Sequence, residues 1–211
     1  MRAPAKLAAS TMQLTGHQGE IYTMKFSSDG QYLASAGFDR MIYFWDVFPQ
    51  EGIDEAAPCK NIGVLKGHKN AILELQWGSS NERMFTASSD RQIFVWDTMS
   101  EFQRIRKMKG HQNVVNAIDT LRRPGSLSEL VVSGSDDFTV KLWDDRVKNF
   151  VASFELDYQI TSVGFSRGAF LGDYVFFGGL DNSIKALNLK KNQIEFALMG
   201  HMDTVTGLSV S

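Results

Sequence analysis

Short apolar runs rich in β-branched and aromatic residues alternate with turn-forming residues along most of the chain. Near the amino terminus, runs at 21–26, 32–35 and 41–45 follow one another closely, and the first two are separated by Ser28, Asp29 and Gly30. These turn residues are typical of tight connections, and the runs are too short for helices. Because the same order recurs further along, the pattern predicts an all-β protein built from short antiparallel strands.

The dipeptide Gly-His recurs along the chain with a long and regular period. It ends at His17, His68, His111 and His201, so successive histidines are 51, 43 and 90 residues apart. Since 90 is twice 45, the last interval holds two repeats, one of which has lost the dipeptide. A period of about 40–45 residues is that of a four-stranded β-propeller blade. The spacing therefore predicts consecutive propeller blades.

Each of the first three repeats has a finer internal register. An aspartate follows the histidine by 22, 22 and 26 positions, a hydroxyl residue precedes that aspartate by four, and a Trp-Asp dipeptide begins six positions after it. The three sets are His17, Ser35, Asp39 and Trp45; His68, Thr86, Asp90 and Trp96; and His111, Ser133, Asp137 and Trp143. This pattern resembles the WD-repeat family over residues 13–211. The resemblance implies that each set forms a buried hydrogen-bonded tetrad in which the hydroxyl links the imidazole to the indole N–H.

The fourth repeat, at 156–189, departs from this pattern. Leu156 stands where the histidine is expected, Phe177 replaces the hydroxyl and Leu187 replaces the tryptophan, whereas Asp181 is retained. Replacing every polar partner together can be nearly neutral in free energy. We therefore expect this blade to keep its turn and to pack an apolar cluster in place of the polar network.

The resemblance also implies how the chain is organised. We expect a flexible tail at 1–11, followed at 12–211 by a partial WD-repeat β-propeller with repeats at about 12–46, 63–97, 106–144 and 151–189 and a fifth begun at 196–211. Residues 12–15 would form the outer strand of the last blade, and 204–210 the first strand of a fifth. We favour an incomplete seven-bladed ring over a closed four-bladed one. An open ring would need a second chain to cover its apolar faces.

Composition narrows the class of protein further. The formal net charge is −2, so no basic excess favours wholesale binding of nucleic acid. The single cysteine, Cys59, excludes an internal disulfide and is typical of a reducing compartment. No apolar run approaches the ~20 residues that a membrane helix needs. We interpret one small basic cluster as a solvated strand edge rather than an RNA site: Arg104, Arg106, Lys107 and Lys109.

Candidate chemistry is sparse. All four histidines are assigned to Gly-His positions, which leaves none for a general base or a metal ligand. The segment Gly164-Phe165-Ser166-Arg167-Gly168 matches a nucleophile-elbow pattern, but it falls at a strand end and its turn rather than between a strand and a helix. We therefore predict a protein that is not an enzyme, with no cofactor and no bound metal.

Function is then expected at a surface. In a propeller, the loops before the first strands and the turns between the second and third strands share one face, here called the top face. The candidate partner-binding residues there are Gln18, Glu20, Phe38, Lys69, Ala71, Ser89, Gln112, Val114, Asp136 and Leu180. Phe38 and Leu180 are the informative pair, because large apolar side chains at exposed turns often mark partner sites. Insertions at 48–62 and 122–129 fall on the opposite, bottom face, as docking loops or as tolerated surface variation.

Finer details favour one subfamily. Residues 35–40, 157–159, 178–182 and 200–209, taken in order, resemble the WD-repeat subunits of the U5 small nuclear ribonucleoprotein of the spliceosome. This resemblance implies a nuclear scaffold in pre-mRNA splicing that binds other U5 proteins and associates indirectly with small nuclear RNA, without membrane or small-molecule substrate.

An alternative remains from the end of the third repeat. Trp143, Asp144 and Arg146 are similar to the box by which some WD-repeat proteins dock onto a cullin ubiquitin-ligase adaptor as substrate receptors.

Overall fold

The computed structural model describes residues 13–47, 60–99 and 102–210. Within them it contains four antiparallel four-stranded sheets, each a simple meander, so the all-β prediction is confirmed. Blade 1 comprises β1 (Ile21–Phe26), β2 (Tyr32–Gly37), β3 (Met41–Asp46) and β4 (Lys60–Lys66). Blade 2 comprises β5 (Ile72–Trp77), β6 (Arg83–Ser88), β7 (Gln92–Asp97) and β8 (Arg104–Lys109).

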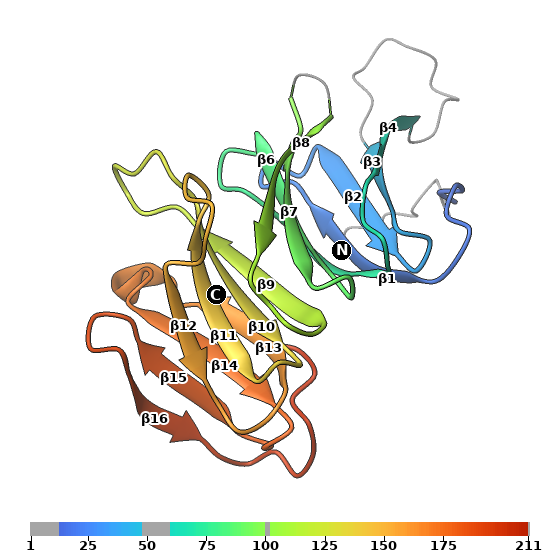
Figure 1. Cartoon of the computed structure of the whole chain (residues 1–211). Coiled ribbons are helices and arrows are strands. Elements are labelled where there is room, and N and C mark those ends of the chain that lie inside the picture. Colours follow the sequence, from blue (N-terminus) through green and yellow to red (C-terminus); the bar gives the residue numbers. More distant parts are fainter. Residues whose placement is uncertain (1–12, 48–59, 100–101, 211) are drawn as a thin grey trace, which may run out of the picture.

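The remaining blades follow the same order. Blade 3 comprises β9 (Val115–Leu121), β10 (Leu130–Ser135), β11 (Thr139–Asp144) and β12 (Ala152–Glu155). Blade 4 comprises β13 (Ile160–Phe165), β14 (Tyr174–Gly179), β15 (Ile184–Asn188) and β16 (Gln193–Leu198), with one short 3-10 helix, Gly168–Phe170, between β13 and β14. The blades succeed one another in an arc, with blades 1 and 4 at its two ends (Figure 1).

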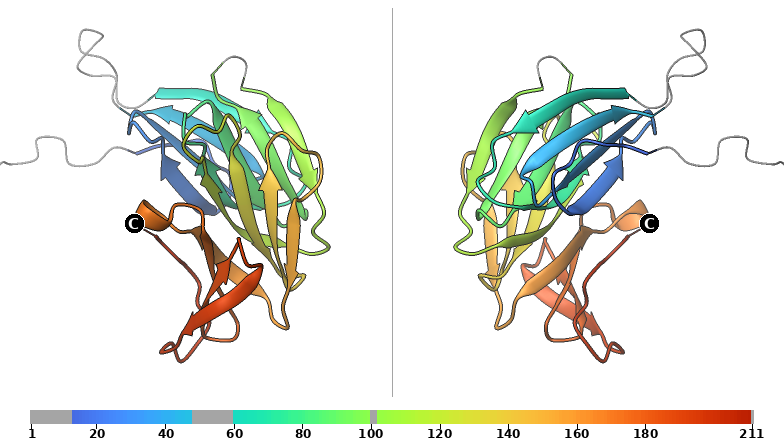
Figure 2. Two further views of the ribbon diagram at one scale, coloured as in Figure 1. Left: turned by 90° about the vertical axis from the view of Figure 1, so that its left-hand side faces the viewer. Right: turned by 90° about the vertical axis from the view of Figure 1, so that its right-hand side faces the viewer.

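The first strand of each blade is the inner one. β1 packs beside β5, β5 beside β9 and β9 beside β13, which orders the four sheets around a common axis (Figure 2). Side chains from one inner strand reach the backbone of the preceding one. The Trp77 indole N–H donates to the Lys25 carbonyl at 2.9 Å, the Thr120 hydroxyl to Trp77 at 2.9 Å, and the Arg167 guanidinium to Thr120 at 3.1 Å. These contacts tie each blade to the one before it.

The apolar core lies between successive blades rather than within one. One cluster joins blades 1 and 2 through fully buried residues such as Ile42, Phe44 and Ile72. Corresponding clusters join blades 2 and 3, and blades 3 and 4. At the ends of the arc the equivalent faces are open. β1 exposes Ile21, Tyr22, Met24 and Phe26, and β16 exposes Ile194, Phe196 and Leu198.

Two strands expected at the ends of the chain are not formed. Residues 13–15 and 204–210 are not in strands, because a strand is defined by its pairing and none of the described residues pairs with these segments. Residues 204–210 instead lie along blade 4. The Val205 N–H donates to the Gly179 carbonyl at 3.2 Å, the Thr161 hydroxyl donates to the Val205 carbonyl, and the Val205 side chain is buried.

The predicted insertions are placed in part. The insertion at 122–129 connects β9 to β10, as the repeat register predicts. Most of the other, 48–59, lies outside the described residues, and its expected last residues, 60–62, already belong to β4. The tail predicted at 1–11 also lies outside them. No helix among the described residues is long and apolar enough to cross a membrane.

Candidate protein-binding surface

The residues predicted to form three tetrads come together in blades 1–3. In blade 3 the Trp143 Nε1–H donates to Ser133 Oγ at 2.8 Å, Ser133 Oγ lies 2.7 Å from His111 Nε2, and His111 Nδ1 lies 2.8 Å from Asp137 Oδ2. Blades 1 and 2 contain the same three contacts at 2.8–3.0 Å. Each tetrad therefore joins the loop before the inner strand to the second and third strands of its blade.

The protonation of the blade 3 tetrad follows from its surroundings. Burial lowers the pKa of His111, so the ring is neutral, donates through Nδ1–H to Asp137 and accepts at Nε2 from the Ser133 hydroxyl. Burial alone would raise the pKa of Asp137, but hydrogen bonds from His111, Thr139 and Gln112 outweigh it and lower that pKa well below its usual range. Each polar group of the tetrad is hydrogen-bonded to another member, so the tetrad is suited to holding the blade together rather than to proton transfer.

The tetrad aspartates also set the shape of the top face. In blade 1, Asp39 Oδ2 accepts from the backbone N–H of Gln18 at 3.1 Å, and its Oδ1 accepts from that of Met41 at 3.1 Å. Asp90 and Asp137 hold the matching loops and turns of blades 2 and 3 in the same way. One buried carboxylate thus fixes the two top-face segments of a blade against each other. A surface fixed in this way loses little conformational entropy when a partner binds.

The residue after each tetrad aspartate adopts a left-handed backbone. Arg40, Arg91 and Phe138 have φ of 66°, 70° and 66°, and Asn182 has 61° at the matching position of blade 4. Residues other than Gly, Asn and Asp rarely adopt this backbone conformation, so these turns carry strain that the surrounding hydrogen bonds offset. Arg40 and Phe138 project from the top face and are exposed. The sequence pattern pointed to the residue before each aspartate, whereas these two exposed residues follow it.

Five of the predicted top-face residues line one groove between blades 1 and 2, with a volume of about 640 Å³. They are Gln18, Phe38, Lys69, Ala71 and Ser89, and Asp39, Arg40, Met41 and Asn70 complete the wall. Phe38 is 58% exposed, although one edge of its side chain lies against Gly19 of the neighbouring loop. The groove therefore combines an open aromatic side chain with two exposed cations, Arg40 and Lys69.

The other predicted residues are not brought into this groove. Gln112 lines a second depression, on blade 3 and its flanking loops, together with Phe138 and Phe150. Asp136 accepts a hydrogen bond from Asn116 at 2.7 Å and is half-buried. The remaining three, Glu20, Val114 and Leu180, line neither depression, although Leu180 is 47% exposed.

Blade 4 keeps a polar pair that the sequence did not reveal. Leu156, Phe177 and Leu187 pack in the apolar cluster between blades 3 and 4, as expected. Asp181 nevertheless has a cationic partner, because Lys185 Nζ lies 2.9 Å from Asp181 Oδ2 and also 4.5 Å from the centre of the Tyr158 ring. A lysine four positions after the aspartate is the signal for this pair. Asp181 thus exchanges a histidine for a lysine rather than losing its partner.

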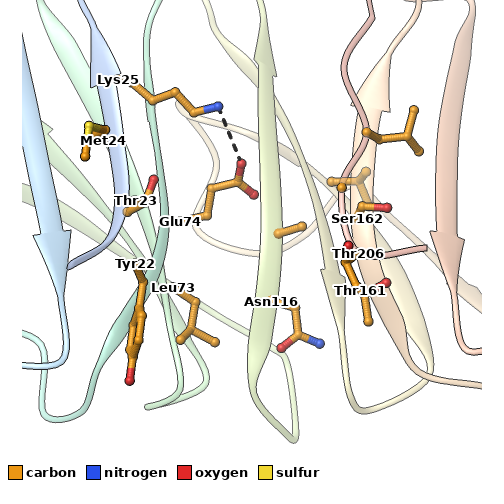
Figure 3. A pocket seen from close by; sticks show the side chains of 14 residues that line it. Tyr22, Thr23, Met24, Lys25, Leu73, Glu74, Asn116, Thr161, Ser162 and Thr206 are labelled. Carbon is orange, nitrogen blue, oxygen red and sulfur yellow. Dashed lines mark ion pairs between the residues drawn. The ribbon is translucent and has the colours of Figure 1, made fainter. Parts of the chain in front are cut away.

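The inner strands line a central channel of about 470 Å³ (Figure 3). Most of its side chains are small or polar, and Glu74 is the acidic one among them. Burial raises the pKa of Glu74 to about 7, against the opposing effects of a hydrogen bond from the Ile118 N–H and the charge of Lys25. Lys25 Nζ lies 4.0 Å from Glu74 Oε1, drawn as a dashed line in Figure 3.

The serine of the Gly-x-Ser-x-Gly segment at 164–168, which we did not expect to be catalytic, makes structural hydrogen bonds. Ser166 is buried, and its hydroxyl donates to the Phe170 carbonyl while accepting from the Tyr174 N–H at 3.0 Å. The histidines His17, His68 and His111 serve the tetrads, whereas His201 is exposed. Within the part of the chain that the structure describes, no group of three or more metal-ligating side chains converges.

Two of the three residues of the predicted ligase-adaptor box are buried and not available to a partner. Trp143 is buried in its tetrad and Asp144 is buried beside it. The Arg146 side chain is 63% exposed, but it folds back on Asp144, with Nη2 at 2.7 Å from Oδ2 and Nε at 3.0 Å from Oδ1. The guanidinium of Arg146 is therefore already paired within the chain, with the Asp144 carboxylate.

The chain forms four-stranded meanders arranged around an axis, and three of them contain a hydrogen-bonded network of His, hydroxyl, Trp and Asp side chains. These features define blades of a WD-repeat β-propeller. A family model described as "WD domain, G-beta repeat" matches residues 9–46, 59–97 and 102–144, more than half of the chain. The chain belongs to the WD-repeat family. The family model does not match blade 4, which is the blade that has lost three of its four tetrad residues.

Curated relatives share sequence along nearly the whole chain. "Pre-mRNA-splicing factor cwf17" of Schizosaccharomyces pombe is 39% identical over 206 residues, which are 98% of this chain and 56% of that protein. The "U5 small nuclear ribonucleoprotein 40 kDa protein" of Homo sapiens is 41% identical over 207 residues, 98% of this chain and 54% of that protein. The protein of that name from Dictyostelium discoideum is 39% identical over 90% of this chain. The chain spans about half the length of the curated relatives that it matches.

Proposed function

We propose that this protein is a non-catalytic, nuclear, protein-binding platform of the U5 small nuclear ribonucleoprotein and acts in pre-mRNA splicing. The observation that carries the proposal is the identity of about 40% over 98% of the chain to proteins named for U5 and for splicing. The aligned region covers all four blades, so the likeness to these proteins is not confined to one repeat.

The top face supports the platform role. Its loops and turns are held by buried aspartates, so they present a rigid surface. The groove between blades 1 and 2 places Phe38 beside Arg40 and Lys69. Aromatic and arginine side chains dominate the binding energy of many protein interfaces. We propose that U5 protein subunits bind at this groove and that small nuclear RNA associates chiefly through them.

Co-purification tests the proposal. The tagged full chain is expected to recover U5 proteins from nuclear extract of its own organism. Phe38→Ala is expected to reduce that recovery several-fold, whereas Phe170→Ala, which removes a 62% exposed phenylalanine ring from the 3-10 helix between β13 and β14, leaves it unchanged. Recovery of cullin-ligase components without U5 proteins would overturn the proposal in favour of the adaptor-box alternative. Equal recovery by both variants would overturn the placement of the site.

A further inference from the structure

The outer strand of blade 2, β8, differs in charge from the other three outer strands. Four of its six residues are cations and none is acidic: Arg104, Arg106, Lys107 and Lys109. The corresponding strand β4 has a lysine at each end, and β12 and β16 each carry one glutamate and no cation. A general need to protect edge strands with charge would apply to all four strands. The concentration of cations on β8 therefore requires its own explanation.

Two of these cations converge on one aromatic ring. The Arg104 Cζ lies 4.8 Å and the Lys107 Nζ 5.1 Å from the centre of the Phe94 ring. His68 stacks on the same ring at 3.9 Å, with 11° between the planes, so the cations occupy the other face. Arg104 also lies across Gly67, where an added Cβ would stand 2.9 Å from its Nη1. The tetrad of blade 2 thus holds a platform that positions two positive charges.

In the two following blades a lysine on the third strand occupies the position of Phe94, and each of these lysines has a partner. In blade 3, Lys141 donates to Ser153 at 2.7 Å and is near Glu155. In blade 4, Lys185 pairs with Asp181. In blade 2, none of Lys69, Arg104, Lys107 and Lys109 has an ion pair with any described residue. Repulsion by Arg104, with smaller effects of burial, Lys109 and Lys69, lowers the pKa of Lys107. Three cations therefore act on Lys107, and the charge of the tetrad Asp90 opposes them.

We propose that Lys69, Arg104, Lys107 and Lys109, here called the blade 2 cationic surface, bind the phosphate backbone of an RNA strand. Arginine and lysine bind phosphate oxygens through charge-assisted hydrogen bonds, and a line of phosphates can relieve the repulsion among four cations at once. An acidic protein segment fits less well. Tight peptide binding needs an apolar anchor; the Phe94 ring is buried, and on β8 only Ile105, at 49% exposure, offers apolar surface.

This inference rests on the proposed function, because a ribonucleoprotein supplies the RNA. It goes beyond that function in assigning a direct contact with RNA to a surface that runs from Lys69, in the top-face loop before β5, to the outer strand β8. It replaces the interpretation of the basic cluster on β8 as a solvated strand edge. Because the whole chain has a net charge of −2, its long-range field does not attract a polyanion, and the contact is local. Isolated binding should accordingly be weak, with a Kd on the order of 10⁻⁵ M at moderate salt.

Fluorescence anisotropy with a labelled single-stranded oligouridine RNA tests the inference on the full chain. The double variant Arg104→Gln/Lys107→Gln is expected to weaken binding about tenfold and to reduce the slope of log K against log salt from about −3 towards −1.4, since each phosphate contact contributes about −0.7. The matched control is Lys190→Gln/Lys191→Gln, which removes the same charge from lysines paired with Asp173 and Glu195. This control should bind like the unaltered chain.

A second variant tests whether the loss of binding comes from misfolding rather than from the lost charges. Lys69→Gln/Lys109→Gln changes two exposed side chains away from the Phe94 ring and is expected to weaken RNA binding similarly, with an unchanged melting temperature. Equal loss in the Lys190/Lys191 control would overturn the inference, and so would tighter binding of an oligoglutamate peptide than of the RNA. If RNA binding is absent while U5 proteins still co-purify, this inference fails and the proposed function stands.

Discussion

Glu74 on β5 accepts a hydrogen bond at 2.9 Å from the backbone N–H of Ile118 on β9, which joins the inner strands of blades 2 and 3. Asp119 repeats the arrangement one blade further on, where its Oδ2 accepts from the Phe165 N–H at 2.7 Å. The two carboxylates differ in their counter-charge. Arg167 Nη2 lies 2.8 and 2.9 Å from the oxygens of Asp119, whereas Lys25 stands 4.0 Å from Glu74.

Glu74 is expected to make stability fall as pH rises. Burial raises its pKa from 4.5 in the unfolded chain to about 7 in the folded protein. Between these values the folded protein holds a proton that the unfolded chain has released, so raising the pH through this window favours unfolding. The side chain is 23% exposed to the channel, which reduces the effect to about 2 kcal/mol.

Urea unfolding at pH 5 and pH 8 measures this effect. Glu74→Gln is expected to lose the decrease in unfolding free energy between these two pH values, whereas Glu20→Gln, a change at an exposed glutamate, should retain it. A Glu74→Gln variant with the same pH dependence as the unaltered chain would refute the assignment.

Removing one tetrad hydroxyl should be costly. Ser133→Ala leaves the indole N–H of Trp143 and the Nε2 of His111 without partners, and both side chains are buried. Two orphaned buried groups are expected to cost about 2–4 kcal/mol of unfolding free energy. Thr86→Ser is the control, because it keeps the hydroxyl of the blade 2 tetrad and removes one methyl group, at a cost of about 1 kcal/mol. Similar losses in the two variants would show that the hydroxyl is not what matters.

Phe138 offers a stabilising substitution. Its φ of 66° is unfavourable for an aromatic residue, and its ring is 45% exposed. Asn182 occupies the equivalent turn position of blade 4. Phe138→Asn is therefore expected to raise the unfolding free energy by about 0.5–1 kcal/mol, read from chemical denaturation. Arg91→Asn should behave alike, and a loss of stability in both variants would contradict the argument from strain.

The blade 4 pair is expected to show coupling. Lys185→Met leaves Asp181 with Ser183 as its remaining side-chain partner, while Asp181→Asn/Lys185→Met removes both charges. A double-mutant cycle should give a coupling of about 0.5–1 kcal/mol at neutral pH, since both groups are partly exposed. Because the pKa of Asp181 is lowered below 3.8, this coupling is present at neutral pH and is lost as the acid is protonated below that value. A coupling of zero at pH 7 would mean that the ion pair does not stabilise the blade.

The amino-acid sequence by itself determined the blades and their tetrads. His17, Ser35, Asp39 and Trp45 lie at spacings set by strand length and turn length within one meander, so their meeting follows from local structure. The same reasoning placed Leu156, Phe177 and Leu187 in an apolar cluster. The repeated interval marked these residues and the resemblance to the WD-repeat family implied the tetrad, whose contacts all lie within one repeat.

Contacts between neighbouring blades, and between neighbouring strands at the edge of a sheet, depend on the tertiary structure alone. The groove that joins Phe38 to Lys69, the raised pKa of Glu74 and the stacking of Arg104 and Lys107 on Phe94 depend on which side chains face one another across packed sheets. The spacing of residues along one strand carries no information about burial by another blade. For the same reason residues 204–210 are expected from the sequence to form a strand, but beside blade 4 they make one backbone hydrogen bond, from Val205 to Gly179, and no strand, since a strand depends on its neighbour as much as on the segment itself.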